Sequence, residues 1–151
     1  MLTNGKILAV IPARWGSTRF PGKPIVDILG KPMIQWVSEQ ALKANLINEV
    51  VIATDDKRIY DVVFGFGGKA IMTSSSHQSG TDRVAEIAKN VECDIVVNVQ
   101  GDEPFIDAIS LSKLIDAFKN DTDKEIDLAS LKVQITNKED IENPNNVKVI
   151  T

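Results

Sequence analysis

The stretch "ILAVIPARWGSTRFPGKP", residues 7–24, indicates both the fold class and the place where this protein binds its ligand. Its first five residues, 7–11, form a continuous apolar run, which is typical of a parallel strand buried on both faces. The prolines and glycines that follow disfavour a helix and predict a loop. This loop carries three cations, Arg14, Arg19 and Lys23. Because α/β proteins bind ligands beyond the carboxyl ends of their strands, the position of these charges predicts an anionic ligand.

Beyond this stretch, short apolar runs alternate with segments of helical periodicity. The apolar runs predict further buried strands at 50–53, 70–72 and 95–99. Apolar side chains recur at the spacing of one helix face at 33–41, 59–66, 84–88 and 111–118. This alternation predicts a doubly wound α/β fold with a mostly parallel sheet.

Three further local patterns yield more specific expectations. Asp55 precedes the second helical segment and is predicted to cap its N-terminus. The segment "LKVQI" at 131–135 alternates apolar and polar residues, which predicts a half-exposed strand. The segment "VKVI" at 147–150 is expected to form another strand. Because the chain stops there, we expect it to be truncated at its C-terminus.

Composition narrows the class of protein. A chain of 151 residues has the usual length of one domain, and its net charge of -4 disfavours non-specific binding to nucleic acid. A single cysteine, Cys93, allows no intrachain disulfide and fits a reducing compartment. No apolar run approaches the roughly 20 residues of a membrane span, and the N-terminus lacks the apolar core of a signal peptide. We therefore expect a cytoplasmic protein without a membrane or nucleic-acid partner.

Three polar loops, at 12–24, 73–82 and 100–104, follow predicted strands. The first suits a phosphate chain, since backbone N–H groups and cationic side chains both bind phosphate oxygens. Its glycine spacing matches neither the Walker A loop nor the dinucleotide-binding fingerprint. The alternative is that its cations are solvated surface charges, but their grouping at a strand end favours a binding site.

The motifs "IPARWGSTRFPGKP", "MTSSSHQSGTDR" and "VVNVQGDEPFI" together resemble those of sugar nucleotidyltransferases, and the last two narrow the resemblance to the CMP-Kdo synthetase family. The resemblance covers nearly the whole chain. It implies a fold of the nucleotide-diphospho-sugar transferase type and an enzyme, a CTP-dependent nucleotidyltransferase. The implied reaction converts CTP and Kdo (3-deoxy-manno-octulosonate) into CMP-Kdo and pyrophosphate with Mg²⁺, for lipopolysaccharide biosynthesis.

The resemblance also implies roles for the charged residues. Arg14 and Lys23 would bind the CTP phosphates and offset the charge that builds on the leaving pyrophosphate, so they are candidate catalytic residues. Asp102 matches a metal ligand of the family and is both a catalytic and a metal-binding candidate. Arg19 is a substrate-binding candidate, which faces either the phosphates or a neighbouring carboxylate.

The polar residues receive roles in the same way. The loop with Ser74 and Ser79 would surround cytosine and ribose, and these two serines are the leading contacts. Gln100 matches a residue near the sugar and would hydrogen-bond a hydroxyl or the carboxylate of Kdo. His77, the single histidine, invites a role as general base, but we favour a hydrogen-bonding role because the chemistry depends on metal and positioning.

Members of the family are longer than this chain. Residues 1–151 are therefore expected to be the nucleotide-binding part of a cytidylyltransferase domain. The family's C-terminal part carries a second metal-binding carboxylate, much of the Kdo pocket and most of the interface of the homodimer that is implied at full length. Two alternatives stay open: a cytidylyltransferase for another acidic sugar such as sialic acid, and a truncated CTP-binding module without turnover.

Overall fold

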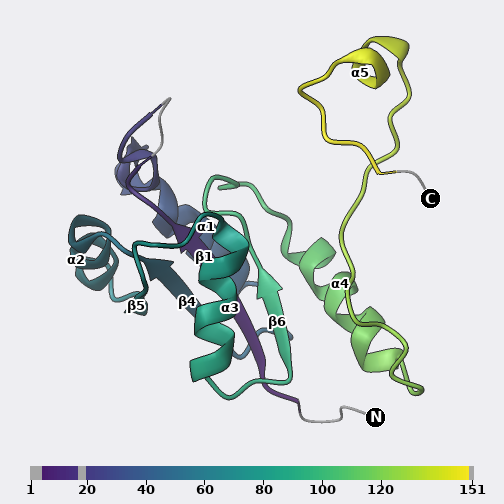
Figure 1. Cartoon of the computed structure of the whole chain (residues 1–151), viewed down its shortest axis with the longest axis horizontal. Coiled ribbons are helices and arrows are strands. Elements are labelled where there is room, and N and C mark those ends of the chain that lie inside the picture. The colour runs from purple at the N-terminus through teal and green to yellow at the C-terminus, as the bar shows by residue number, and fades with distance from the viewer. Residues whose placement is uncertain (1–4, 17–19, 150–151) are drawn as a thin grey trace.

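A four-stranded parallel sheet forms the centre of the computed structural model, which describes residues 5–16 and 20–149 (Figure 1). The strands are β1 (Ile7–Ala13), β4 (Glu49–Thr54), β5 (Ala70–Met72) and β6 (Ile95–Asn98). Their order in the sheet is β5-β4-β1-β6, so the first strand lies in the middle. Val10 of β1 is level with Val51 of β4 and with Asn98 of β6. The predicted parallel α/β sheet is confirmed.

Helices cover both faces of this sheet, as the doubly wound prediction requires. The helices α1 (Met33–Leu42), α2 (Lys57–Gly65) and α4 (Ala108–Asn120) share one core with the side chains of Ile7, Ala9 and Ile11. The helix α3 (Gly80–Asn90) packs on the opposite face, against Leu8 and Val10. All five of these β1 side chains are at most 2% exposed. Burial on both faces is the physical reason for the continuous apolar run.

A short antiparallel hairpin connects the loop after β1 to the first helix. It follows the 3-10 helix η1 (Lys23–Ile25) and consists of β2 (Asp27–Ile28) and β3 (Lys31–Pro32). The indole Nε1 of Trp36 on α1 donates a hydrogen bond to the Ile28 carbonyl at 2.8 Å. This contact ties the hairpin to α1, so the segment that leaves the loop after β1 is anchored to the core.

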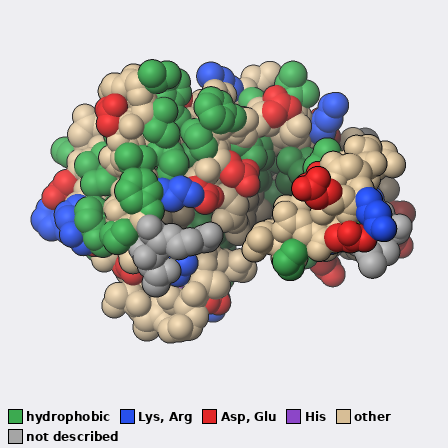
Figure 2. Space-filling model, turned by 90° about the horizontal axis from the view of Figure 1, so that it is seen from above, with side chains coloured by type: hydrophobic (Ala, Val, Ile, Leu, Met, Phe, Trp, Pro, Cys, Tyr) green, Lys and Arg blue, Asp and Glu red, His purple; other side chains and the backbone are tan. Residues whose placement is uncertain are grey.

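The two C-terminal strand predictions are wrong for the described residues. Residues 131–135 and 147–149 pair with no strand, and beyond α4 the one regular element described is α5 (Lys138–Glu142). Figure 2 shows this segment as a lobe beside the main body, and Val133 and Val147 are 88% and 99% exposed. An alternating pattern forms a strand only where a neighbouring strand satisfies its backbone groups. No described strand lies beside it, so the pattern alone is not sufficient.

None of the described helices combines the length and the apolar character that crossing a membrane requires.

Candidate active site

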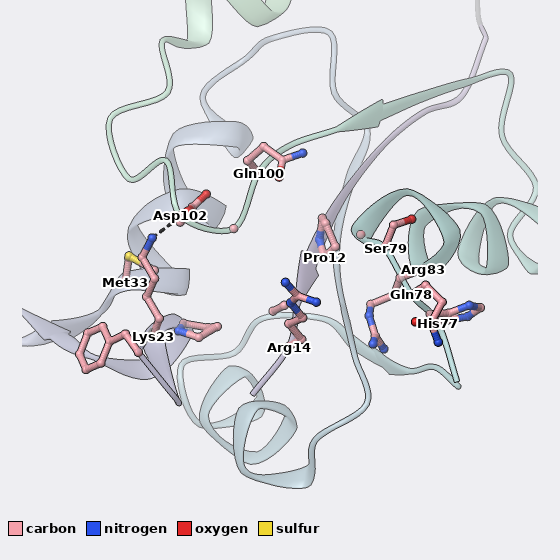
Figure 3. Close-up of a pocket in the computed structure, with 15 residues that line it drawn as sticks. Pro12, Arg14, Lys23, Met33, His77, Gln78, Ser79, Arg83, Gln100 and Asp102 are labelled. Carbon is pink, nitrogen blue, oxygen red and sulfur yellow. Dashed lines mark hydrogen bonds and ion pairs between the residues drawn. The ribbon is translucent and has the colours of Figure 1, made fainter. Parts of the chain in front are cut away.

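A cleft of about 700 Å³ opens at the carboxyl ends of the strands, within the size range of small-molecule sites (Figure 3). All three predicted loops contribute to it, although they are far apart in the sequence. The described residues that line it are Pro12, Ala13, Arg14, Phe20, Lys23, Pro24, Met33, His77, Gln78, Ser79, Gly80, Arg83, Gln100, Gly101 and Asp102. The convergence expected from the strand ends is therefore present.

The loops approach closely around Pro12, at the end of β1. A Cβ atom at Gly101 would lie 2.7 Å from the Pro12 carbonyl oxygen, closer than such atoms can pack. A Cβ at Gly80 would lie 3.2 Å from Cγ of Pro12. The glycines therefore allow the loop after β6 and the start of α3 to come together beside β1. Sequence reasoning missed this role, because a glycine alone does not reveal which chain segment approaches it.

Lys23 and Asp102 form an ion pair on one side of the cleft (Figure 3). The Lys23 ammonium donates a hydrogen bond to Asp102 Oδ2 at 2.7 Å, although the two residues are 79 positions apart (Figure 3). Their side chains are 39% and 52% exposed, so the ion pair stabilises the fold by at most about 1 kcal/mol. An incoming phosphate or metal ion can therefore replace either partner at small energetic loss.

Arg14 lies in the middle of the cleft (Figure 3). It is exposed, and none of the described residues is a hydrogen-bond or ion-pair partner for its guanidinium. Its five N–H donors are thus available to an anion, in the fork geometry that suits phosphate. Arg19, the third predicted cation, lies outside the described residues. Gln100 lines the cleft beside Asp102, and its side chain makes one long contact, 3.4 Å from its Nε2 to Asn98 Oδ1.

Trp15 packs within the loop after β1 and is not among the described lining residues of the cleft. The backbone N–H of Gly22 donates to the Trp15 carbonyl at 3.1 Å, and Gly22 has a φ of 73°, in the left-handed region that glycine tolerates. The indole ring packs so closely that a Cβ at Gly22 would lie 3.0 Å from it. On α2, the guanidinium carbon of Arg58 lies 3.4 Å from the centroid of the indole ring.

Ser79 lines the cleft and is also the N-cap of α3. Its hydroxyl accepts a hydrogen bond from the Asp82 N–H at 3.1 Å, and the Asp82 carboxylate accepts from the Ser79 N–H at 3.0 Å. The Ser79 hydroxyl also donates to that carboxylate, and these bonds hold the pKa of Asp82 below its ordinary value. A ligand that binds this hydroxyl would therefore share it with the N-cap hydrogen bond of α3. Ser74 does not line the cleft, and its hydroxyl contacts that of Ser76 at 2.7 Å.

Glu86 of α3 holds the loop that contains His77. Its carboxylate accepts a hydrogen bond from the Ser74 N–H at 3.0 Å and a second, short one from His77 Nε2. The bond from Ser74 and then the one from His77 hold the pKa of Glu86 below its usual value. His77 thus faces the cleft with one ring nitrogen engaged, which fits the hydrogen-bonding role favoured above.

Arg83 is a buried cation in the wall of the cleft. It is 3% exposed and donates to Asp55 Oδ2 at 2.9 Å, to the hydroxyl of Thr73 and to the Ser74 carbonyl at 3.4 Å. The predicted cap on α2 is wrong, because Asp56 fills that position and leaves Asp55 to neutralise Arg83. Since Asp55 and Arg83 are 28 positions apart, no local pattern could have joined them.

A metal ion would find a limited set of ligands here. The described residues contain no group of three or more His, Cys, Asp or Glu side chains that could hold one. Among the lining residues that the structure describes, Asp102 is the one with an acidic side chain. One carboxylate with phosphate oxygens and water is a common way of binding Mg²⁺, so Asp102 fits a Mg²⁺ ion that arrives on a polyphosphate.

Comparison with known proteins agrees with this geometry. Residues 8–151 match the model of a family described as cytidylyltransferase. The chain is 53% identical over 145 residues to the 3-deoxy-manno-octulosonate cytidylyltransferase of Flavobacterium johnsoniae, a match that covers 96% of this chain and 59% of that protein. It is 49% identical to the protein of the same name from Trichlorobacter lovleyi, with 97% of this chain and 57% of that one covered.

A solved structure supports the same relationship. It is described as CMP:2-keto-3-deoxy-manno-octonic acid synthetase complexed with CTP, and it matches with a TM-score of 0.76 and 52% sequence identity. The match covers 77% of this chain and 48% of that one, so this chain spans about half to three-fifths of the length of these relatives. The predicted nucleotide-diphospho-sugar transferase fold is confirmed. With a family match over nearly all of its length, the chain belongs to the cytidylyltransferase family.

Proposed function

We propose that this chain forms the nucleotide-binding part of an enzyme that transfers CMP from CTP to the anomeric hydroxyl of Kdo and releases pyrophosphate. The observation that carries the proposal is the meeting of the three motif loops around one cleft, with Arg14, Lys23 and Asp102 among its lining residues. Relatives that are about half identical in sequence carry the name of this activity, which favours Kdo over sialic acid as the acceptor.

The cations of the cleft suit the triphosphate of CTP. Arg14 offers a guanidinium that no described residue engages, and Lys23 is held by one exposed ion pair. When a triphosphate enters, Lys23 exchanges Asp102 for phosphate oxygens, since the exposed pair contributes little energy. Both cations then stand where negative charge grows as pyrophosphate departs, which stabilises the transition state.

Asp102 is proposed to hold Mg²⁺ together with phosphate oxygens once Lys23 has moved away. Bound there, Mg²⁺ would neutralise phosphate charge and lower the pKa of the attacking sugar hydroxyl. The chain's own contribution is positioning: it orients the α-phosphate so that the hydroxyl attacks in line with the departing pyrophosphate.

The remaining predicted residues act in recognition. Ser79 is proposed to contact the ribose or the base, and Ser74, in the same loop, to assist it. Gln100 is proposed to hydrogen-bond Kdo. The side chain of Gln100 is exposed and lines the same cleft as Asp102, which supports this role. At the length of its relatives, the protein is proposed to be a cytoplasmic homodimer with a second metal-binding carboxylate.

A CTP-binding module without turnover is the second candidate. The observation in its favour is that Asp102 is the one acidic lining residue that the structure describes, in a chain that spans 57% to 59% of two relatives. We expect the 151-residue chain to bind CTP weakly and to form little CMP-Kdo, whereas a protein extended to the relatives' length does both.

The nucleotide is tested by calorimetric titration of the chain with CTP, ATP and GTP, each with Mg²⁺. The proposal predicts the highest affinity for CTP, because the loop at 73–80 presents hydrogen-bonding groups that can distinguish bases. Equal affinity for all three nucleotides would contradict the assignment to cytidine.

A further inference from the structure

Trp15 lies in the loop that carries Arg14 and Lys23, the two cations proposed to bind phosphate. It follows Arg14 directly, and its carbonyl accepts the N–H of Gly22, the residue before Lys23. Its indole ring lies against Gly22 on the way to the short helix η1 that begins at Lys23. A shift of Trp15 would therefore displace both Arg14 and Lys23, although Trp15 is not itself among the described lining residues.

Arg58 holds this indole ring from α2. Its guanidinium stacks on the ring, 3.4 Å from the ring centroid. The guanidinium is in turn fixed by the carboxylate of Asp56, with Nε 2.9 Å from Oδ1 and Nη2 2.6 Å from Oδ2. Asp56 is the N-cap of α2 and accepts the Arg58 N–H at 2.9 Å, so the anchor belongs to a regular element of the core.

From this chain of contacts we infer that Arg58 is a positioning residue, which acts through Trp15 to hold Arg14 and Lys23 in the arrangement that binds phosphate. The inference rests on the proposed nucleotide site and adds to it a residue outside the cleft. A cation fixed over an indole face is attracted by the electron-rich ring, and a planar guanidinium stacks where an ammonium cannot. Binding groups that are held in place before the ligand arrives bind it more tightly than mobile ones.

The test compares Arg58→Met, Arg58→Lys and the matched control Lys57→Met in the 151-residue chain. Lys57 is the neighbouring cation on α2, and its side chain is 81% exposed in an ion pair with Asp61. Two quantities are measured: the dissociation constant of Mg²⁺–CTP by calorimetry, and the fluorescence and iodide quenching of Trp15. The fluorescence is read in a Trp36→Phe background, because Trp15 and Trp36 are the two tryptophans of the chain.

We expect Arg58→Met to weaken CTP binding by about 3- to 30-fold, the range of one cation–π contact, and to raise the quenching of Trp15. Arg58→Lys should recover part of the affinity, and Lys57→Met should match the wild type in both measurements. Unchanged affinity and unchanged quenching in Arg58→Met would overturn the inference. If the wild type bound no CTP, the proposed function would fail, and the quenching of Trp15 by itself would decide whether Arg58 holds the loop.

Discussion

Replacement of Lys23 by alanine tests whether its ammonium is a catalytic group or an ordinary surface charge. In the structure its ammonium pairs with Asp102 at 2.7 Å, with side-chain exposures of 39% and 52%. Loss of so exposed a pair changes the free energy of unfolding by less than about 1 kcal/mol. If Lys23 stabilises the departing pyrophosphate, however, its loss removes one preorganised electrostatic group from the transition state, which corresponds to roughly 2–4 kcal/mol. The expected fall in rate is about 30- to 1000-fold.

Lys31 provides a closely matched control. Its ammonium pairs with the Glu39 carboxylate at 2.8 Å, and the two side chains are 38% and 37% exposed. Lys31→Ala therefore removes an ion pair of the same kind outside the cleft. Pyrophosphate release from CTP and Kdo is measured for both variants in a protein of the relatives' length, and urea unfolding is measured alongside. Equal rates in the two variants would refute a catalytic role for Lys23 and leave it as a solvated surface charge.

Three further changes test the supports of the cleft. Asp55→Asn leaves the buried charge of Arg83 without a counter-charge, and we expect urea unfolding to show a loss of about 3 kcal/mol. Gly101→Ala places a methyl group against the Pro12 carbonyl, which should lower the free energy of unfolding by about 1–3 kcal/mol and weaken CTP binding. Glu86 has a folded pKa below its ordinary 4.5, so the stability that it contributes is complete above that pH and is lost as the pH falls through the folded value. Glu86→Gln should therefore lessen the decline of thermal stability on acidification.

The first two of these changes have matched controls, and each of the three has a result that would contradict it. Asp61→Asn breaks an exposed pair with Lys57 and should cost less than about 1 kcal/mol; if Asp55→Asn did no more, the buried pair would not matter to stability. A Cβ at Gly65 would meet nothing within 4 Å, so Gly65→Ala should be tolerated, and equal tolerance of Gly101→Ala would contradict the close approach. If thermal stability declined on acidification in Glu86→Gln as it does in the wild type, the Glu86 carboxylate would not hold the loop.

The position of the cleft could be predicted from the sequence because it depends on local signals. The continuous apolar run at 7–11 marks a strand buried on both faces, and the parallel order places the loops after β1, β5 and β6 at one edge of the sheet. Strand ends therefore locate a site even when the contacts within it are unknown. The structure brings Arg14, Lys23, Ser79, Gln100 and Asp102 together around one cleft, whereas Ser74 is not among its lining residues and Arg19 lies outside the described residues.

The pairings within the cleft could not be predicted, because they depend on which side chains meet in space. Lys23 and Asp102 were assigned separate ligands, yet they contact each other, and Asp55 was assigned to a helix cap that Asp56 supplies. Two adjacent aspartates before a helix cannot be told apart as caps from the sequence. The buried Arg83 determines that Asp55 forms the ion pair and that Asp56 caps the helix. The strand predicted at 131–135 failed for a related reason: strand formation requires a partner that no local pattern reveals.

Formation of CMP-Kdo from CTP, Kdo and Mg²⁺ tests most directly whether this cleft belongs to a cytidylyltransferase. The measurement is made on a protein of the relatives' length, with Asp102→Asn and the neighbouring Glu103→Gln, which lies outside the lining residues, as its control. We predict one pyrophosphate released for each CMP-Kdo formed, a rate at least about 100-fold lower in Asp102→Asn, and a nearly unchanged rate in Glu103→Gln. Pyrophosphate release that does not depend on Kdo, or full activity in Asp102→Asn, would contradict the proposed reaction and the role of Asp102 in it.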